Sequence, residues 1–233
     1  MASIESTLPA LRDLCRSAPP TPANAQIAVF AKAPRAGYAK TRLAPLLGAA
    51  GAARLQRRMT IHALSVAYAA RLGPVQLWCA PAAGERFFRA LSLTYGVQCA
   101  SQSGGDLGAR MAAAFAAGFV AAPQRPVLLM GCDCPLLAPA HLHAAAAALA
   151  AGKDAAFVTA ADGGYVLIGL NGLYAELFAG IEWGGPQVMA DTRARMRRLG
   201  LVWEEVAQLW DVDTPQDVAR LSGAGWKLPD HAA

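Results

Sequence analysis

Short apolar runs alternate with longer helical stretches along most of the chain, and this alternation constrains the fold more than any other feature of the sequence. The runs are five or six residues long, and most are rich in Ile, Val, Leu or Phe, which is typical of buried strands. The predicted strands are 26–31, 75–80, 97–101 and 126–130. The predicted helices are 48–72, 84–94, 107–120 and one that begins near Pro139. Strands joined by helical crossovers pair in parallel, with helices on both faces of the sheet. The sequence therefore predicts a single-domain, three-layer α/β/α sandwich with a mostly parallel, doubly wound sheet.

The last third of the chain departs from this alternation. The runs 155–160 and 165–170 are joined through Asp162-Gly163-Gly164, so they are predicted to pair directly as strands. The remaining predicted elements are helices at 173–178, 187–199 and 215–221, and a late strand at 201–206.

The length of 233 residues suits one sizeable α/β domain and is too short for two. Residues 1–24 are rich in Ser, Pro and Ala and are predicted to form an arm or a short helix, followed by the domain at 25–223 and a tail at 224–233. Hydrophobic residues make up 55% of the chain, but the longest apolar runs are short or dominated by alanine, so no membrane span is predicted. Charged residues precede the first apolar stretch, unlike a secretory signal, and we expect a cytoplasmic protein.

The net charge of +5 and the isoelectric point of about 9.1 favour an anionic partner. Basic residues cluster at 32–42, 54–58 and 193–198, but no cluster is interleaved with aromatic residues, so nucleic acid is not predicted as a partner. The last cluster is predicted to be a solvated helix face. The five cysteines are scattered, and the close pair Cys132 and Cys134 is predicted to be buried thiols rather than a metal site.

The segment 30–43, with the sequence FAKAPRAGYAKTRL, carries the sharpest functional signal. It places four cations, a glycine and a proline after the first predicted strand and before a helix. Backbone N–H groups and Lys or Arg side chains in such a loop can hold phosphates. The segment matches neither the Walker motif nor the dinucleotide glycine triplet. A solvated basic loop is the weaker alternative, because the segment directly follows the first strand.

Asp133 follows the apolar strand at 126–130 and stands just before Pro135, so its carboxylate is expected to point into the same crevice. Mg²⁺ and similar hard cations are commonly held by one or two carboxylates together with substrate phosphates. Asp133 is therefore the candidate metal ligand. The alternative is that it caps the helix beginning near Pro139, although it stands several residues too early for that role.

Three further acidic segments could complete the site. Asp106 follows two glycines and either caps the helix at 107–120 or contacts a sugar or base. Asp162 lies in a strong turn signal, and the roles of turn and site residue are compatible. Asp211 and Asp213 alternate along an extended segment, so both carboxylates point the same way and can converge on a metal or on substrate hydroxyls.

These segments, in this order, resemble the glycosyltransferase A fold of the nucleotide-diphospho-sugar transferases, which is Rossmann-like. The resemblance covers roughly residues 26–221 and rests on the pieces FAKAPRAGYAKTRL, GCDCPLL, DGGYVLIGL and DVDTPQD. Within that fold the chain is similar to a bacterial glycosyltransferase-like group related to 2-phospho-lactate guanylyltransferase and molybdenum cofactor guanylyltransferase. The chain departs from the family pattern in three places. The family usually has Thr or Ser at Cys132 and Gly-Pro at Thr159-Ala160, and sugar transferases commonly carry Asp-x-Asp where this chain offers Asp133 alone.

The resemblance implies a nucleotide-binding domain that uses Mg²⁺ or Mn²⁺. The catalytic residues that it implies are Lys40, Arg42 and Asp133. The implied contacts to the nucleotide and its phosphates are Lys32, Pro34, Gly37, Thr41, Gly105, Asp106 and Arg110. The implied substrate contacts are Asp162, Gly163, Gly164 and Tyr165. The implied metal ligands are Asp133, Asp211 and Asp213.

Transfer from an activated nucleotide to a small-molecule acceptor is the function that the resemblance implies. Glycosyl transfer from a nucleotide-sugar is the leading hypothesis, and the alternative is nucleotidyl transfer, as in a guanylyltransferase, to a small phosphorylated or carboxylated acceptor. Because the Asp133 loop offers a single carboxylate, a non-catalytic nucleotide-binding protein is a further alternative. Both reactions build negative charge on phosphate oxygens, which preplaced cations stabilise. Each of these functional hypotheses requires the basic loop at 30–43 and Asp133 to face each other across one cleft.

Overall fold

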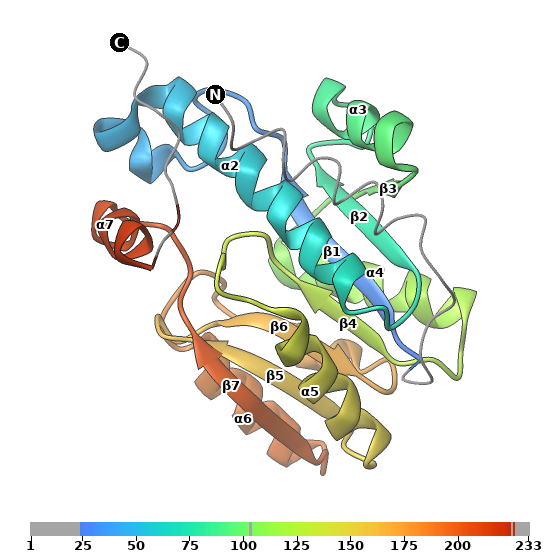
Figure 1. The fold of residues 1–233 in the computed structure, drawn as a ribbon. Helices are drawn as coiled ribbons and strands as arrows, with labels where there is room; N and C mark the ends of the chain where they lie inside the picture. The colour runs from blue at the N-terminus through green and yellow to red at the C-terminus, as the bar shows by residue number, and fades with distance from the viewer. Residues whose placement is uncertain (1–23, 103, 225, 227–233) are drawn as a thin grey trace.

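A seven-stranded sheet forms the centre of the computed structural model, which describes residues 24–102, 104–224 and 226 (Figure 1). The strand order is β3-β2-β1-β4-β6-β5-β7. The strands are β1 (Gln26–Lys32), β2 (Val75–Ala80), β3 (Gln98–Ser101), β4 (Val127–Met130), β5 (Ala155–Ala160), β6 (Tyr165–Leu170) and β7 (Trp203–Leu209). Only β6 runs against its neighbours, β4 and β5, and all other pairs are parallel. The predicted mostly parallel sheet with a direct β5–β6 pair is confirmed.

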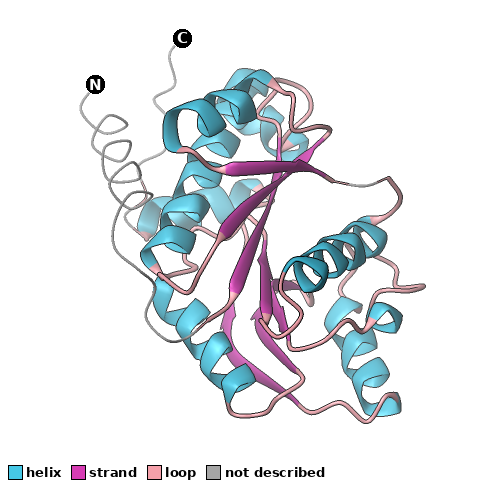
Figure 2. Ribbon diagram, turned by 90° about the vertical axis from the view of Figure 1, so that its right-hand side faces the viewer, coloured by secondary structure: helices cyan, strands magenta, loops and turns pink. Residues whose placement is uncertain are grey.

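Helices cover both faces of this sheet, as the side view shows (Figure 2). They are α2 (Ala44–Ala69), α3 (Arg86–Tyr95), α4 (Leu107–Ala121), α5 (Pro139–Ala150), α6 (Val188–Arg198) and α7 (Pro215–Gly223), with 3-10 turns η1 (Thr41–Leu43) and η2 (Ala175–Leu177). Helices α2, α3 and α5 pack on one face, whereas α4 and α6 pack on the other. The predicted three-layer sandwich is confirmed.

The alternation of side chains along β1 explains why two separate cores form. Ile27 and Val29 point into the core beneath α2 and α5, whereas Ala28 and Phe30 point into the core beneath α4 and α6. Successive residues of a strand face opposite sides, so a strand that is apolar throughout must be covered on both faces. A third, smaller cluster joins the first half of α2 to α7 and the segment after β7.

Several boundaries differ from the sequence-based prediction. Helix α2 begins at Ala44 rather than at residue 48, because Pro45 starts a first turn and a kink at Gly48 (φ 68°) joins it to the long helix. The predicted helix at 173–178 is only the 3-10 turn η2. The late strand reaches Leu209, because β7 pairs with the whole of β5.

The basic cluster at 193–198 is not simply a solvated helix face, which corrects that expectation. Arg193 makes a bidentate ion pair with Glu205 on β7, with both N–O distances at 2.7 Å, and this pair lowers the pKa of Glu205. Arg195 donates to the carbonyl of Gly180 at 3.0 Å. These two side chains fasten α6 to its surroundings.

Two predicted regions, the N-terminal arm and the C-terminal tail, lie largely outside the residues that the structure describes. The proposed N-terminal arm falls on residues 1–23, and most of the proposed tail falls on 225 and 227–233, so both lie outside the described residues. Among the described helices, none combines the length and the apolar character needed to cross a lipid bilayer.

Candidate functional site

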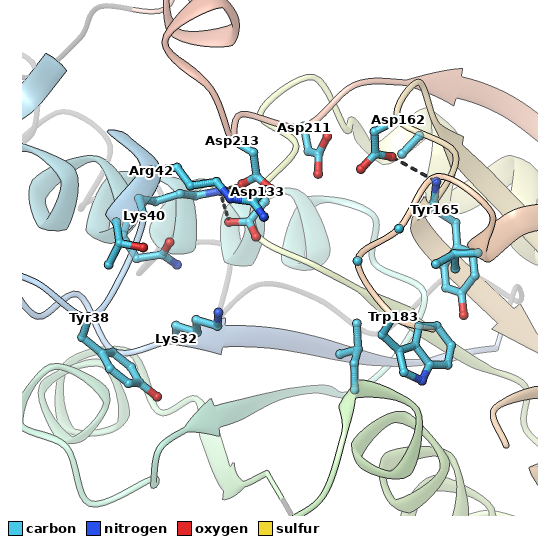
Figure 3. A pocket seen from close by; sticks show the side chains of 18 residues that line it. Lys32, Tyr38, Lys40, Arg42, Asp133, Asp162, Tyr165, Trp183, Asp211 and Asp213 are labelled. Carbon is cyan, nitrogen blue, oxygen red and sulfur yellow. Dashed lines mark hydrogen bonds and ion pairs between the residues drawn. The ribbon is translucent and has the colours of Figure 1, made fainter. Parts of the chain in front are cut away.

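The carboxyl ends of β1, β4, β5 and β7 lie at the same end of the sheet, and the loops that leave them enclose a cavity of about 420 Å³ (Figure 3). This is the edge at which ligands bind in open α/β sheets. The cavity brings together residues of the basic loop, Asp133, the β5–β6 turn and the segment after β7. The basic loop and Asp133, far apart in sequence, therefore face each other across one cleft, as the interpretation of the sequence required.

Lys40 is the centre of this arrangement. Its side chain is only 5% exposed, and its ammonium lies 2.8 Å from Asp133 Oδ1 and 2.9 Å from Asp213 Oδ1. The ammonium also donates to the carbonyl of Val212 at 2.8 Å. Burial lowers the pKa of Lys40, but the two carboxylates outweigh it and hold the pKa above its ordinary value. One lysine thus joins the loop after β1 to the loops after β4 and β7.

The backbone explains why Lys40 points inward. It adopts the left-handed conformation (φ 51°, ψ 42°), which is uncommon for a residue with a side chain. Its neighbour Ala39 is buried, and Leu43 at the end of η1 is fully buried in the third core cluster. Strained backbone of this kind persists when surrounding packing fixes it, and it concentrates at functional sites.

The other loop residues divide into two groups. Lys32, Thr41 and Arg42 line the cavity, and Arg42 is 76% exposed with a guanidinium nitrogen 4.0 Å from Asp213 Oδ2. Pro34 and Gly37 are not among the cavity-lining residues. Gly37 has a positive φ of 76° and serves the turn of the loop.

Asp133 is held by its backbone and leaves its carboxylate partly exposed. The amide of Val212 donates to the Asp133 carbonyl at 2.9 Å, and the Asp133 side chain is 47% exposed. The capping alternative does not apply, because α5 begins at Pro139 and His141 Nδ1 accepts from the amide of Ala138 at 3.0 Å.

The flanking thiols of Cys132 and Cys134 are buried, as predicted from the sequence. Burial is the main cause that raises their pKa values, to about 12 and about 11. The side-chain amide of Gln56 donates to Cys132 Sγ at 3.0 Å.

Asp211 and Asp213 both line the cavity but differ in their surroundings. Asp213 pairs with Lys40, whereas no Lys or Arg nitrogen of the described chain lies within 4.0 Å of Asp211. Burial, followed by the neighbouring carboxylates of Asp162 and Asp213, raises the pKa of Asp211 to about 6.

The donor set can be tested against the metal that the resemblance implies. Within the described residues, no three His, Cys, Asp or Glu side chains are grouped closely enough to hold a metal by themselves. Asp133 and Asp213 each give one oxygen, Oδ1, to the Lys40 ammonium, and both side chains are nearly half exposed, so the second oxygen of each carboxylate is the one left for a cation. Two carboxylates fit a hard cation that takes its other ligands from substrate phosphates.

The β5–β6 turn places Asp162, Gly164 and Tyr165 on the cavity wall. Asp162 Oδ1 accepts from the amide of Gly164 at 3.0 Å, which fixes the carboxylate. Gly163 does not line the cavity. It has a positive φ of 95°, and a Cβ there would overlap the Pro186 carbonyl.

We expect Gly163→Ala to lower the free energy of unfolding by about 2–3 kcal/mol, because the added methyl meets backbone and the conformation is left-handed. Chemical denaturation measures the change. Gly164→Ala is the matched control, since a Cβ there meets only Asp162 Oδ1 at 3.4 Å. Equal stability of the two variants would contradict the tight contact.

Asp106 is the helix cap rather than a cavity residue. Its Oδ1 accepts from the amide of Ala109 at 2.8 Å at the first turn of α4. Neither Gly105 nor Asp106 lines the 420 Å³ cavity or the second cavity beside it. Arg110, one turn further, lines a second cavity of about 320 Å³. The residues that line both cavities are Lys32, Gln56, Leu107, Asp133, Tyr165 and Asp211.

Substitutions at Asp106 separate the capping role from ligand binding. Asp106→Ala is expected to cost about 1 kcal/mol of stability, whereas Asp106→Asn, an equally good cap, changes it by less than about 0.5 kcal/mol. Nucleotide affinity, measured by calorimetry, should be the same in both variants. A loss of nucleotide affinity in Asp106→Asn would show that Asp106 contacts the ligand as well as capping α4.

Sequence reasoning missed several cavity residues, among them the polar or aromatic side chains of Tyr38, Gln56, Gln102 and Trp183. Gln56 sits inside α2, where the helical period gave no reason to single it out. Trp183 lies in the glycine-rich segment before α6, and its run of Trp-Gly-Gly was the one available signal.

Comparison with known proteins shows the family to which the chain belongs. The model of the family described as "Uncharacterized protein conserved in bacteria" (DUF2064) matches residues 63–185, just over half of the chain. The chain belongs to this family. No curated protein matches it.

Solved structures confirm the fold. A "putative nucleotide-diphospho-sugar transferase" from Desulfovibrio desulfuricans G20 is 32% identical, with 82% of each chain covered and a TM-score of 0.75. A nucleotidyl transferase from Methanothermobacter is 17% identical, with 86% of this chain and 97% of that chain covered and a TM-score of 0.54. CMP:2-keto-3-deoxy-manno-octonic acid synthetase complexed with CTP is 12% identical, with 87% and 98% covered and a TM-score of 0.52. The fold of this DUF2064 protein is thus the nucleotide-diphospho-sugar transferase fold that the sequence resembles.

Proposed function

We propose that this DUF2064 protein is a nucleotide-dependent transferase that moves a glycosyl group from a nucleotide-sugar to a small acceptor. The observation that carries the proposal is the convergence of Lys40, Asp133 and Asp213 in a cavity that also presents Arg42 and Lys32. The name of the 32% identical relative supports the same donor class.

The exposed cations are suited to the donor's phosphates. Arg42 and Lys32 are exposed at the cavity, whereas all three ammonium protons of Lys40 already have oxygen partners. We assign phosphate contact to Arg42 and Lys32, and the positioning of the two carboxylates to Lys40. Guanidinium and ammonium groups placed ahead of reaction stabilise the charge that grows on a leaving diphosphate.

Asp133 and Asp213 would hold Mg²⁺ or Mn²⁺ through carboxylate oxygens, with Asp211 at the neighbouring wall of the cavity. When bound, such a cation neutralises phosphate charge. Lys40 keeps the two carboxylates at one point, and so fixes where the donor's phosphates are received.

Nucleotidyl transfer from a nucleoside triphosphate is the second candidate. It is favoured by the number of cations on the basic loop, because a triphosphate carries more charge than a nucleotide-sugar, and by the resemblance of the loop to the guanylyltransferases. The second cavity, with Gln102, Arg110 and Phe30 on its wall, has room for the nucleoside in either reaction.

Calorimetry with a panel of nucleoside triphosphates and nucleotide-sugars, each with and without Mg²⁺ or Mn²⁺, tests the proposal. We expect at least one nucleotide-sugar to bind, more tightly with metal, and to be consumed when acceptors are added. Tight binding of triphosphates alone would favour nucleotidyl transfer. Binding that is indifferent to metal and followed by no turnover would indicate a non-catalytic nucleotide-binding protein.

A further inference from the structure

The charges of the large cavity are divided between its two ends. On one side, the basic loop contributes Lys32, Lys40 and Arg42, and the carboxylates of Asp133 and Asp213 are paired with Lys40 there. On the other side, Asp162 lies with Tyr165 and Trp183 (Figure 3). Asp211 stands between the Lys40 group and Asp162 in this view. The donor's phosphates and the acceptor therefore meet different surroundings.

Asp162 at the far end and Asp211 beside it have no cationic partner within ion-pair distance among the described residues. Among the described residues, no Lys or Arg nitrogen lies within 4.0 Å of Asp162 or Asp211, in contrast to Asp133 and Asp213. One oxygen of Asp162 accepts from the Gly164 amide, and the side chain remains exposed at the cavity wall. A ligand at this end meets acceptors of hydrogen bonds, because an ionised carboxylate can only accept.

Aromatic side chains form the remaining wall. The rings of Tyr165 and Trp183 meet edge to face, with centroids 6.5 Å apart and an interplanar angle of 86°. Gly184 and Gly185 line the cavity beside Trp183 and add no side chain that would fill it. Aromatic surface with a few fixed polar groups is the usual construction of a site for a small organic ligand.

We propose that the end of the cavity formed by Asp162, Asp211, Tyr165 and Trp183 is the acceptor subsite, and that it takes an uncharged, hydroxyl-rich molecule rather than a phosphorylated or carboxylated one. This inference rests on the proposed transferase function. Hydroxyl groups donate to the two carboxylates while C–H surface packs on the rings. The anionic group of a phosphorylated or carboxylated acceptor donates no hydrogen bond and adds a like charge, which is strongly disfavoured at close range.

A matched set of sugars tests the subsite without any donor. Glucose, glucuronate and glucosamine differ by one neutral, anionic or cationic group, and each is titrated into the full chain. Binding is followed by the indole ¹⁵N–¹H signal of Trp183, which is assigned by its loss in Trp183→Phe. We expect glucose to bind at least about tenfold more tightly than glucuronate, as a like-charge contact requires. Equal or tighter binding of glucuronate, binding of glucosamine alone, or no binding of any of the three overturns the proposal.

Substitutions test whether Asp162 and Asp211 cause the preference for glucose over glucuronate. In the double variant Asp162→Asn, Asp211→Asn the preference for glucose over glucuronate should fall to less than about threefold, because amides can donate to the carboxylate. Asp191→Asn, at an exposed position of α6 outside the cavity, is the control and should keep the preference. An unchanged preference in the double variant overturns the assignment.

Donor binding separates a failure of this inference from a failure of the transferase proposal. Nucleotide affinity is measured by calorimetry on wild type and Asp162→Asn, and it should be the same in both. Nucleotide binding with no sugar selectivity overturns the acceptor subsite alone, whereas absence of all nucleotide binding overturns the proposed function.

Discussion

Replacement of Lys40 by methionine is expected to reduce turnover by about 10²–10³-fold and the free energy of unfolding by about 1–3 kcal/mol. Methionine keeps an unbranched, apolar stem of similar length but gives no donor to Asp133, Asp213 or the Val212 carbonyl. Removing one partner of a fully buried ion pair costs about 3–5 kcal/mol. The cost here is smaller, because the carboxylates of Asp133 and Asp213 are 47% and 42% exposed and water can solvate them.

Arg42→Met is the matched control for Lys40→Met. Arg42 is 76% exposed, so its loss should change stability by less than about 0.5 kcal/mol while weakening nucleotide binding about tenfold. Denaturation and calorimetry on the two variants distinguish a positioning lysine from a phosphate-binding arginine. If Lys40→Met were as stable as wild type, or if Arg42→Met bound nucleotide unchanged, the division of roles between them would be wrong.

The fold was predictable because most strands in the middle of the sheet are almost entirely apolar. β2, β5 and β6 match their predicted bounds, since a strand covered on both faces leaves a continuous apolar run in the sequence. β7 was less well placed. Its sequence WEEVAQL has a mixed pattern of burial, and its length is set by pairing with β5 rather than by its own composition.

The meeting of the basic loop and Asp133 was also predictable, because the rule that carboxyl ends of parallel strands share one edge needs no side-chain detail. The direction of individual side chains was not. Lys40 points inward because buried Ala39 and Leu43 fix the loop in a left-handed turn at Lys40, and no sequence pattern announces that conformation.

The roles of Asp106 and Trp183 depend on hydrogen bonds that only the structure shows. The sequence left Asp106 open between cap and ligand contact, and the geometry of α4 makes it a cap. Trp183 escaped notice because its place in the cavity depends on the close approach of its segment to the β5–β6 turn, where the Met189 amide donates to the Gly163 carbonyl at 2.8 Å. Such long-range contacts are not encoded by local periodicity.

Replacement of Asp133 by asparagine should reduce turnover by about 10²–10³-fold while leaving the fold intact. Asparagine has the same shape and keeps one carbonyl oxygen that can accept from Lys40, so the free energy of unfolding should change by less than about 1 kcal/mol. What it removes is the negative charge that would hold Mg²⁺ or Mn²⁺ against the donor's phosphates.

The readout that isolates this charge is the dependence of nucleotide affinity on Mg²⁺. In wild type, metal is expected to tighten nucleotide binding, and in Asp133→Asn this dependence should disappear. Asp213→Asn, at the other side of the Lys40 ammonium, should weaken the dependence in the same direction. If the Asp133→Asn enzyme were fully active, or if its nucleotide binding still responded to Mg²⁺ as in wild type, Asp133 would not be a metal ligand of the active site. Since Lys40 contacts both carboxylates, an unchanged metal dependence in one of the two variants would show that its carboxylate is a partner of the lysine alone and leave the other as the metal ligand.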